Sequence, residues 1–317
     1  MASAVSHPGR SARLCSLLAA AVVTAPASAQ QTDGIARPLT LDSEADRLPV
    51  AATYWPADPG KVEGGLENAA VVVLLPGGNG DRLVWEKKPT IFDRKPLAVV
   101  LRESGFAVVT VDVRGHGQTP LPDGRSIRPN DYQDMLGDLE AVKKFLLEEH
   151  AAKRLNVNKL AIVASDEMTP VALAFANYDW EKPDYDDAPT AAGRTPRGRD
   201  VRALVLLSPE SAAGRLKTYQ AAKLLRNPRA NIATFIGVGA EDPQDKGVSE
   251  RLARQLRVDK EDPESGFFLQ TYPVRFRGTD LIGQPNLRTD LHVLNFLKKF
   301  VQELDSPWRD RTSRLLR

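Results

Sequence analysis

The segment LAIVASDEMTPVALAFA, Leu160 to Ala176, decides how this chain folds. Its first part, Leu160–Ala164, is a continuous apolar run with the length of a strand that is buried on both faces of a sheet. Its last part, Pro170–Ala176, is apolar and begins with a proline, which suits the first turn of a helix. Few residues separate the two parts, so we predict a sharp turn from strand to helix at 165–169.

The same alternation of strand and helix extends in both directions along the chain. We predict two strands within 38–55 and further strands at 69–75, 106–113, 160–164, 201–207, 232–238 and 267–272. We predict helices at 97–103, 131–150, 170–177, 216–226, 248–258 and 291–304. Strands that alternate with helices form a mostly parallel sheet with right-handed crossovers, so the sequence predicts an α/β fold.

The N-terminal residues have the three parts of a secretory signal peptide. Arg10 and Arg13 precede the apolar run 14–23, and Ala27-Ser28-Ala29 is a small-residue cleavage pattern. The apolar run is shorter than the roughly 20 residues that a membrane-spanning helix needs. We therefore expect residues 1–29 to be a signal peptide, Gln30 to be the mature N-terminus and the protein to be exported to the periplasm or the extracellular space.

Composition narrows the possible partners of the mature chain. Cys15 is the only cysteine, so the mature chain can form no disulfide. The whole chain has 43 basic and 41 acidic residues, and Arg10 and Arg13 are lost with the signal peptide, so the charges of the mature chain balance. A balanced chain argues against nucleic acid and anionic membranes as partners. We also expect no transmembrane segment in the mature chain.

Two segments lack the periodicity of helices and strands. Residues 181–200, rich in Pro, Asp, Gly and Arg, predict an irregular excursion from the domain that spans 30–305. The segment 306–317 is a basic tail with four arginines, which we expect to be solvated.

Three short motifs follow predicted strands. They are PGGNG at 76–80, DVRGHGQT at 112–119 and GAEDP at 239–243. Each also has a structural interpretation: a tight turn, a turn that packs around His116, and a helix N-cap at Asp242. The first loop is neither a phosphate-binding nor a dinucleotide-binding motif, because the Lys of the former and the last Gly of the latter are missing.

The order of the elements and these motifs resemble the α/β-hydrolase fold, and within it exported bacterial members whose nucleophile elbow has drifted. The segment 112–119 is similar to the family's D-x-R-G-x-G-x-S turn. The resemblance implies a mostly parallel, twisted sheet of about eight strands with helices on both faces. We expect no large cap domain, because Ser208–Ala230 has room for only one crossover helix.

The resemblance also implies places for catalytic groups. In the family's G-x-S-x-G elbow the Ser is the nucleophile, and here the five places read ASDEM at 164–168. Asp166 therefore occupies the nucleophile place, and Ser165 lies one residue before it. The acid place is Asp242. The oxyanion-hole donors would be the backbone N–H groups of Gly78 and Glu167.

A base that could complete a triad is missing from its usual place. The resemblance puts the catalytic His in the loop after the last strand, but residues 274–289 contain no His. His292 follows slightly later, within the predicted closing helix, and could serve only if that helix began further along the chain.

Two functions therefore stay open. The protein is either a degenerate hydrolase that acts as a binding or accessory module for a small-molecule or acyl ligand, or an active hydrolase of ester or acyl substrates. In the second case a rewired site would use Asp166 or Ser165 with Asp242 and His292. A structural role in the cell envelope is a third hypothesis that rests on the export signal alone. The sequence shows no metal-ligand motif, and we expect neither a metal nor a cofactor.

Overall fold

The computed structural model describes the chain except for residues 3–34, 79, 228–229, 257–263, 265 and 317. The predicted signal peptide at 1–29 and its cleavage before Gln30 lie outside the described residues. Residues 34–317 form one compact unit.

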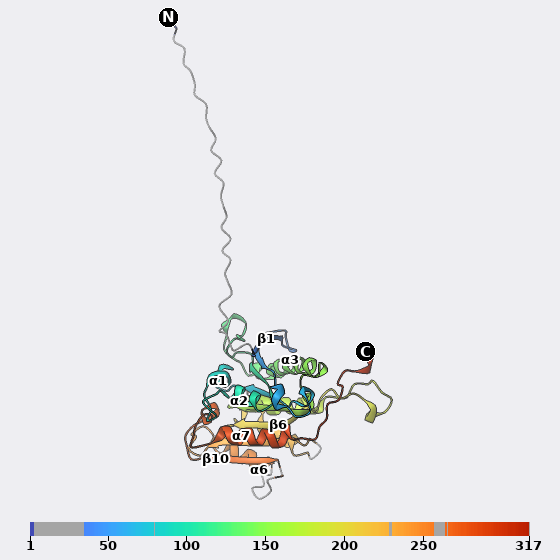
Figure 1. Ribbon diagram of the computed structural model, residues 1–317. Coiled ribbons are helices and arrows are strands. Elements are labelled where there is room, and N and C mark those ends of the chain that lie inside the picture. The colour runs from blue at the N-terminus through green and yellow to red at the C-terminus, as the bar shows by residue number, and fades with distance from the viewer. Residues whose placement is uncertain (3–34, 79, 228–229, 257–263, 265, 317) are drawn as a thin grey trace. The chain divides into compact units, whose positions relative to one another are not determined.

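An eight-stranded sheet forms the centre of this unit (Figure 1). Its strands, in spatial order, are β1 (Arg37–Asp42), β2 (Pro49–Trp55), β4 (Ala107–Asp112), β3 (Val71–Leu75), β5 (Leu160–Ser165), β6 (Val201–Leu207), β9 (Ala233–Gly239) and β10 (Phe267–Tyr272). The pairs β1–β2 and β2–β4 are antiparallel, and the other pairs are parallel. The predicted mostly parallel sheet of about eight strands is confirmed.

Helices cover both faces of the sheet, as predicted. The helices are α1 (Leu83–Lys87), α2 (Leu97–Glu103), α3 (Asp131–Ala151), α4 (Met168–Glu181), α5 (Thr218–Leu225), α6 (Val248–Leu256) and α7 (Thr289–Leu297), which continues as a π-helix over Lys298–Gln302. Short 3-10 helices lie at Pro59–Lys61, Leu66–Asn68, Pro122–Gly124, Val157–Lys159, Ala191–Gly193, Gly278–Leu281 and Arg314–Leu316.

The buried strands divide their side chains between two hydrophobic cores. Along β3, Val71, Val73 and Leu75 pack into the core that α3, α4, α5 and α6 cover, and Val72 and Leu74 pack into the core beneath α1, α2 and α7. Successive residues of a strand point to opposite faces, so a continuous apolar run fills both cores.

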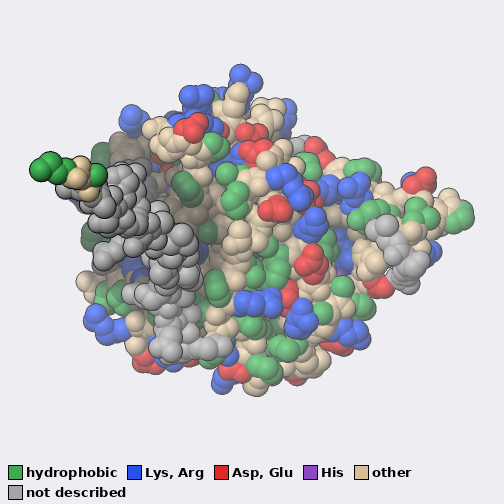
Figure 2. Space-filling model, turned by 90° about the horizontal axis from the view of Figure 1, so that it is seen from above, with side chains coloured by type: hydrophobic (Ala, Val, Ile, Leu, Met, Phe, Trp, Pro, Cys, Tyr) green, Lys and Arg blue, Asp and Glu red, His purple; other side chains and the backbone are tan. Residues whose placement is uncertain are grey.

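The described residues between β6 and β9 form a short hairpin and α5, and they contain no inserted domain. The hairpin consists of β7 (Ala212–Ala213) and β8 (Leu216–Lys217). No helix among the described residues is long and apolar enough to span a bilayer. On the face shown in Figure 2, basic and acidic side chains are interspersed with apolar ones.

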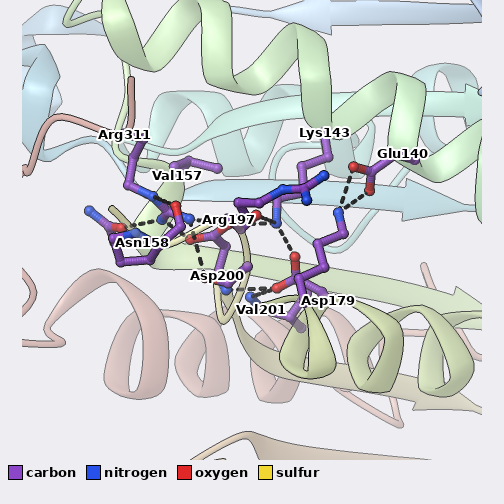
Figure 3. A network of polar contacts seen from close by, with 12 residues as sticks. Glu140, Lys143, Val157, Asn158, Asp179, Arg197, Asp200, Val201 and Arg311 are labelled. Carbon is purple, nitrogen blue, oxygen red and sulfur yellow. Dashed lines mark hydrogen bonds and ion pairs between the residues drawn. The ribbon is translucent and has the colours of Figure 1, made fainter. Parts of the chain in front are cut away.

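Most described residues of the tail are exposed, as expected, but Arg311 and Ser313 are buried. The Arg311 guanidinium is buried and forms an ion pair with Asp200, which also pairs with Lys143 of α3 at 2.6 Å. Lys143 pairs in addition with Asp179 of α4 (Figure 3). The tail is therefore held by a buried charge network that also fixes the end of the 181–200 excursion.

Candidate functional site

The turn between β5 and α4 has the backbone shape of a nucleophile elbow. Asp166 lies in the left-handed region with φ of +52°, an uncommon conformation for a residue other than glycine. Its N–H donates to the carbonyl oxygen of Leu207 at 3.0 Å, which ties the elbow to the end of β6. The strain lies at the residue whose side chain the family uses as nucleophile, as is common at functional sites.

Two glycines make room for the Asp166 carboxylate. A Cβ at Gly77 would lie 2.6 Å from Oδ2 of Asp166 and closer still to the Ser165 backbone. A Cβ at Gly278 would overlap the same carboxylate. Asp166 is therefore enclosed by the loop after β3 and the loop after β10.

Arg277, in the loop after β10, pairs with three carboxylates from three other loops. Its Nε lies 2.8 Å from Oδ1 of Asp166, and its Nη1 donates to Oδ2 of Asp242 at 2.7 Å. Its Nη2 donates to Glu210. The Asp166 contact is close but poorly aligned for a hydrogen bond, since Oδ1 accepts none from the described atoms. Coulombic attraction therefore holds Asp166 against Arg277.

Burial dominates the electrostatics of Asp166. Its carboxyl pKa is raised to about 7, mainly by burial; Arg277 opposes this shift, while the charges of Glu167, Glu210 and Asp242 contribute to it. One guanidinium faces three carboxylates, so it cannot hold all of them ionised at low cost. Asp166 therefore changes its charge near neutral pH.

The predicted oxyanion-hole donor at Gly78 already has a partner within the chain. The N–H of Gly78 donates to Oε2 of Glu167 at 2.8 Å. Oε1 of Glu167 lies 3.6 Å from Nε2 of the buried His116. Burial lowers the pKa of His116, but Glu167 and the backbone groups of Arg114 and Gly78 outweigh burial and raise it. The Glu167 side chain thus occupies the N–H that the sequence predicted as an oxyanion-hole donor.

Comparisons with known proteins identify the fold of the chain. Residues 90–162 match the family model described as serine aminopeptidase, S33. The structure is similar to a bacterial heroin esterase, with 16% identity, 86% of this chain and 87% of that chain covered, and a TM-score of 0.54. It is also similar to an acylaminoacyl peptidase of Pyrococcus horikoshii, with 11% identity, 88% and 44% covered, and a TM-score of 0.56. The protein has the α/β-hydrolase fold.

A third similar structure is a puromycin-hydrolyzing peptidase of Mycobacterium tuberculosis, with 16% identity and a TM-score of 0.53. The match covers 84% of this chain and 39% of that one, so this chain spans less than half the length of either peptidase. No curated protein sequence matches this chain.

Within the α/β-hydrolase fold, His292 does not occupy the base place. Helix α7 begins at Thr289, so His292 lies inside its first turns. Its Nδ1 is hydrogen-bonded to the Tyr272 hydroxyl at 3.0 Å, and the two rings stack. Burial, followed by the charge of Arg288, lowers its pKa. The structure pairs Asp166 and Asp242 with Arg277, and among the described residues His292 forms no hydrogen bond or ion pair with either carboxylate.

Ser165 is likewise turned away from any substrate. It is the last residue of β5 and is fully buried, and its Oγ has no hydrogen-bond partner among the described atoms. Ser165 ends β5, whereas Asp166 is the left-handed residue of the turn that follows, so the buried Ser165 hydroxyl does not take the place of the Asp166 carboxylate.

The predicted helix N-cap at Asp242 is wrong, because α6 begins only at Val248 and Asp242 lies in the turn before it. Its Oδ1 accepts a hydrogen bond from the N–H of Gln244 at 2.9 Å, as in a capped turn, while its Oδ2 accepts from Arg277. Sequence reasoning missed Arg277 and Glu210. Arg277 could have been found as a charged residue inside 274–289, the segment that we searched only for a His.

The turn at 112–119 holds the loop after β3 and helix α3 through buried polar contacts. Asp112 accepts hydrogen bonds from the N–H groups of Arg82 and Gln118, at 2.7 and 2.9 Å. The buried Arg114 pairs with Asp138 of α3 at 2.7 Å. This most specific motif of the resemblance therefore stabilises the scaffold.

Proposed function

We propose that this protein is a catalytically degenerate α/β-hydrolase that binds a small-molecule ligand at the carboxyl edge of its sheet. The observation that carries the proposal is the position of Arg277 between Asp166 and Asp242. In an active hydrolase of this fold, a His there takes a proton from the nucleophile while the acid orients it.

A guanidinium cannot do the work of that His. It carries donors only and stays protonated in proteins, so it can neither accept a proton from a nucleophile nor activate a water molecule. Arg277 instead neutralises part of the charge of Asp166, Asp242 and Glu210. The catalytic relay is thereby replaced by an ion-pair cluster.

The contact between Glu167 and Gly78 supports the same conclusion. A hydrolase stabilises the negative charge that develops on the substrate's oxygen with backbone N–H donors. Here the Gly78 donor is occupied, and the carboxylate of Glu167 would repel a developing oxyanion.

The charges around the site favour a ligand that carries hydrogen-bond donors or a cationic group. Glu167 and Glu210 are partly exposed, and their charges reach Tyr132, whose pKa is raised by burial and by these neighbours. An amine would compensate the excess of carboxylates over Arg277, whereas an acyl carboxylate would add to it.

Export is a further part of the proposal. It is supported by Arg10 and Arg13, the apolar run 14–23 and the cleavage pattern at 27–29. Expression in a bacterial host with an intact secretion system, followed by mass measurement of the protein from cytoplasm, periplasm and medium, tests it. Full-length protein confined to the cytoplasm would contradict it.

The second candidate, an active hydrolase, has the esterase and peptidase neighbours of the fold and the strained backbone of Asp166 in its favour. Hydrolysis of short- and medium-chain p-nitrophenyl esters by residues 30–317 separates the two candidates. We expect no turnover above background for the unaltered protein, Asp166→Asn or Arg277→Gln. A hydrolase would be established if the unaltered protein turned over an ester, Asp166→Asn abolished the turnover and the control Arg275→Gln, at an exposed position nearby, preserved it.

Ligand binding can be tested separately by thermal unfolding. We expect benzylamine or spermidine to raise the unfolding temperature, and Glu210→Gln to reduce that increase. Benzyl alcohol is the neutral control for benzylamine. An equal increase with the alcohol would contradict a site selective for cationic groups.

A further inference from the structure

A cavity of about 550 Å³ lies at the opposite edge of the sheet from the candidate site. The 181–200 excursion, the start of β6 and the C-terminal tail enclose it. Its lining contains six arginines, Arg194, Arg199, Arg202, Arg309, Arg311 and Arg314. Asn158 and Arg311 of its wall belong to the network in Figure 3.

The strand direction separates this cavity from the elbow. Arg202 lies at the amino end of β6, whereas the N–H of Asp166 bonds to Leu207 at its carboxyl end. A strand rises about 3.3 Å per residue, so the two ends of β6 are roughly 20 Å apart. The cavity is therefore distinct from the pocket region that the α/β-hydrolase fold uses for catalysis.

Carboxylates neutralise only half of the six arginines. Arg311 pairs with Asp200, Arg194 with Asp186 at 2.6 Å, and Arg199 with Asp184 at 3.2 Å. The remaining three form no ion pair with a carboxylate in the described part of the chain, and they are Arg202, Arg309 and Arg314. The lining carries two carboxylates, Asp305 and Asp310. The six arginines therefore face five carboxylates, an excess of one positive charge.

Burial is the main influence on the charge of Arg202, which lies in the wall of the cavity. Its Nε donates to the carbonyl oxygen of Asn158 at 3.2 Å. Burial lowers the pKa of Arg202 and the charge of Arg311 lowers it further, although Asp200 and Asp179 oppose the shift. A partly buried cation with an incomplete set of counter-charges is a place where a bound anion releases free energy.

We propose that this cavity binds a small anion that carries two or more phosphate groups. The volume is within the usual range for small-molecule sites, about 300–1,000 Å³. The planar fork of a guanidinium matches phosphate oxygens in two parallel hydrogen bonds. Arg202 would hold one phosphate group in the interior, and Arg309 and Arg314 would hold the other near the mouth.

Isothermal titration calorimetry with pyrophosphate tests the proposal. We expect one pyrophosphate bound per chain, at least tenfold more tightly than orthophosphate. Arg202→Gln and Arg314→Gln should each weaken binding at least tenfold. Arg254→Gln on α6, outside the cavity, should leave the Kd unchanged. Arg311 is left unaltered because its ion pair supports the fold, and thermal unfolding of each variant confirms that it is folded.

Two outcomes would overturn the proposal. One is the absence of saturable pyrophosphate binding, or binding that Arg254→Gln weakens as much as Arg202→Gln. The other is binding of the protein to vesicles of phosphatidylglycerol and phosphatidylcholine, provided that Arg202→Gln abolishes this binding and free pyrophosphate neither binds nor competes. That outcome would assign the cavity to a membrane surface.

Discussion

Two of the charge clusters in the described part of the chain differ in their balance of cations and carboxylates. In the network of Figure 3, the cations Lys143 and Arg311 face the carboxylates Asp179 and Asp200, and these side chains are at most 5% exposed. In the cluster at the elbow, the single cation Arg277 faces Asp166, Asp242 and Glu210.

The carboxyl pKa values follow this difference. Burial opposes the ionisation of Asp200, but Lys143 and Arg311 outweigh it and lower its pKa. Asp166 shares the single cation Arg277 with Asp242 and Glu210, and its pKa is raised to about 7. Buried charges keep a fixed structural role where cations and carboxylates balance, and a buried carboxyl titrates near neutral pH where they do not.

The largest effect is expected from breaking the balanced network. Lys143→Met leaves Asp179 and Asp200 with Arg311 alone and should lower the free energy of unfolding by about 3–5 kcal/mol. The adjacent Lys144, 62% exposed and paired with Glu44, is the matched control, and Lys144→Met should change stability by less than about 1 kcal/mol. Urea unfolding at pH 7 measures both, and equal effects would show that burial of the pair is irrelevant.

The pH dependence of Asp166 sharpens the comparison. Its folded pKa of about 7 exceeds the ordinary 3.8, so the folded state binds this proton more tightly than the unfolded state does. Stability should therefore fall as the pH rises from about 4 to about 7, by roughly 2–4 kcal/mol, and stay level above that range.

Asp166→Asn removes this proton and keeps the left-handed backbone, which Asn tolerates. We therefore expect the unfolding free energy of the wild type to fall relative to that of Asp166→Asn as the pH rises from 4 to 8. A constant difference, or one that grows in favour of the wild type with rising pH, would contradict the raised pKa.

Removing the only cation of the elbow cluster should have a moderate effect. Arg277→Gln leaves three carboxylates without a charged partner, so we expect a loss of about 1–3 kcal/mol at pH 8 and a smaller loss at pH 5. Arg275→Gln, at an exposed position of the same loop, serves as control. A loss that does not depend on pH would indicate a packing role for Arg277.

The smallest effect is expected from two buried serines beside the elbow. The Ser165 hydroxyl has no partner among the described atoms, so Ser165→Ala should change stability by less than about 1 kcal/mol, toward greater stability. Ser208 accepts a hydrogen bond from the N–H of Gly278 at 2.8 Å, and Ser208→Ala should cost about 1–2 kcal/mol. Similar losses in the two variants would mean that Ser165 has a partner in solution.

Much of the fold could be predicted because local pattern and burial agree. The bounds of β6, β10 and α2 match the predicted ranges. Each is a continuous or periodic apolar run whose flanking residues are polar, glycine or proline. Helix α1 was missed because it is only five residues long. The buried position of Arg311 could not be predicted, because its ion pair with Asp200 joins residues more than a hundred positions apart.

The sequence by itself determined the α/β-hydrolase scaffold, the place of Asp166 at the elbow and the lack of a His in the loop after the last strand. These features depend on residue order and short-range spacing. Only the tertiary structure decided what replaced the missing base and where the positive charges gathered. Arg277 meets Asp166, Asp242 and Glu210 because parallel strands bring distant loops together at their carboxyl ends. The six arginines line one cavity at the opposite edge because the 181–200 excursion and the C-terminal tail pack there, and charge balance is set among neighbours in space.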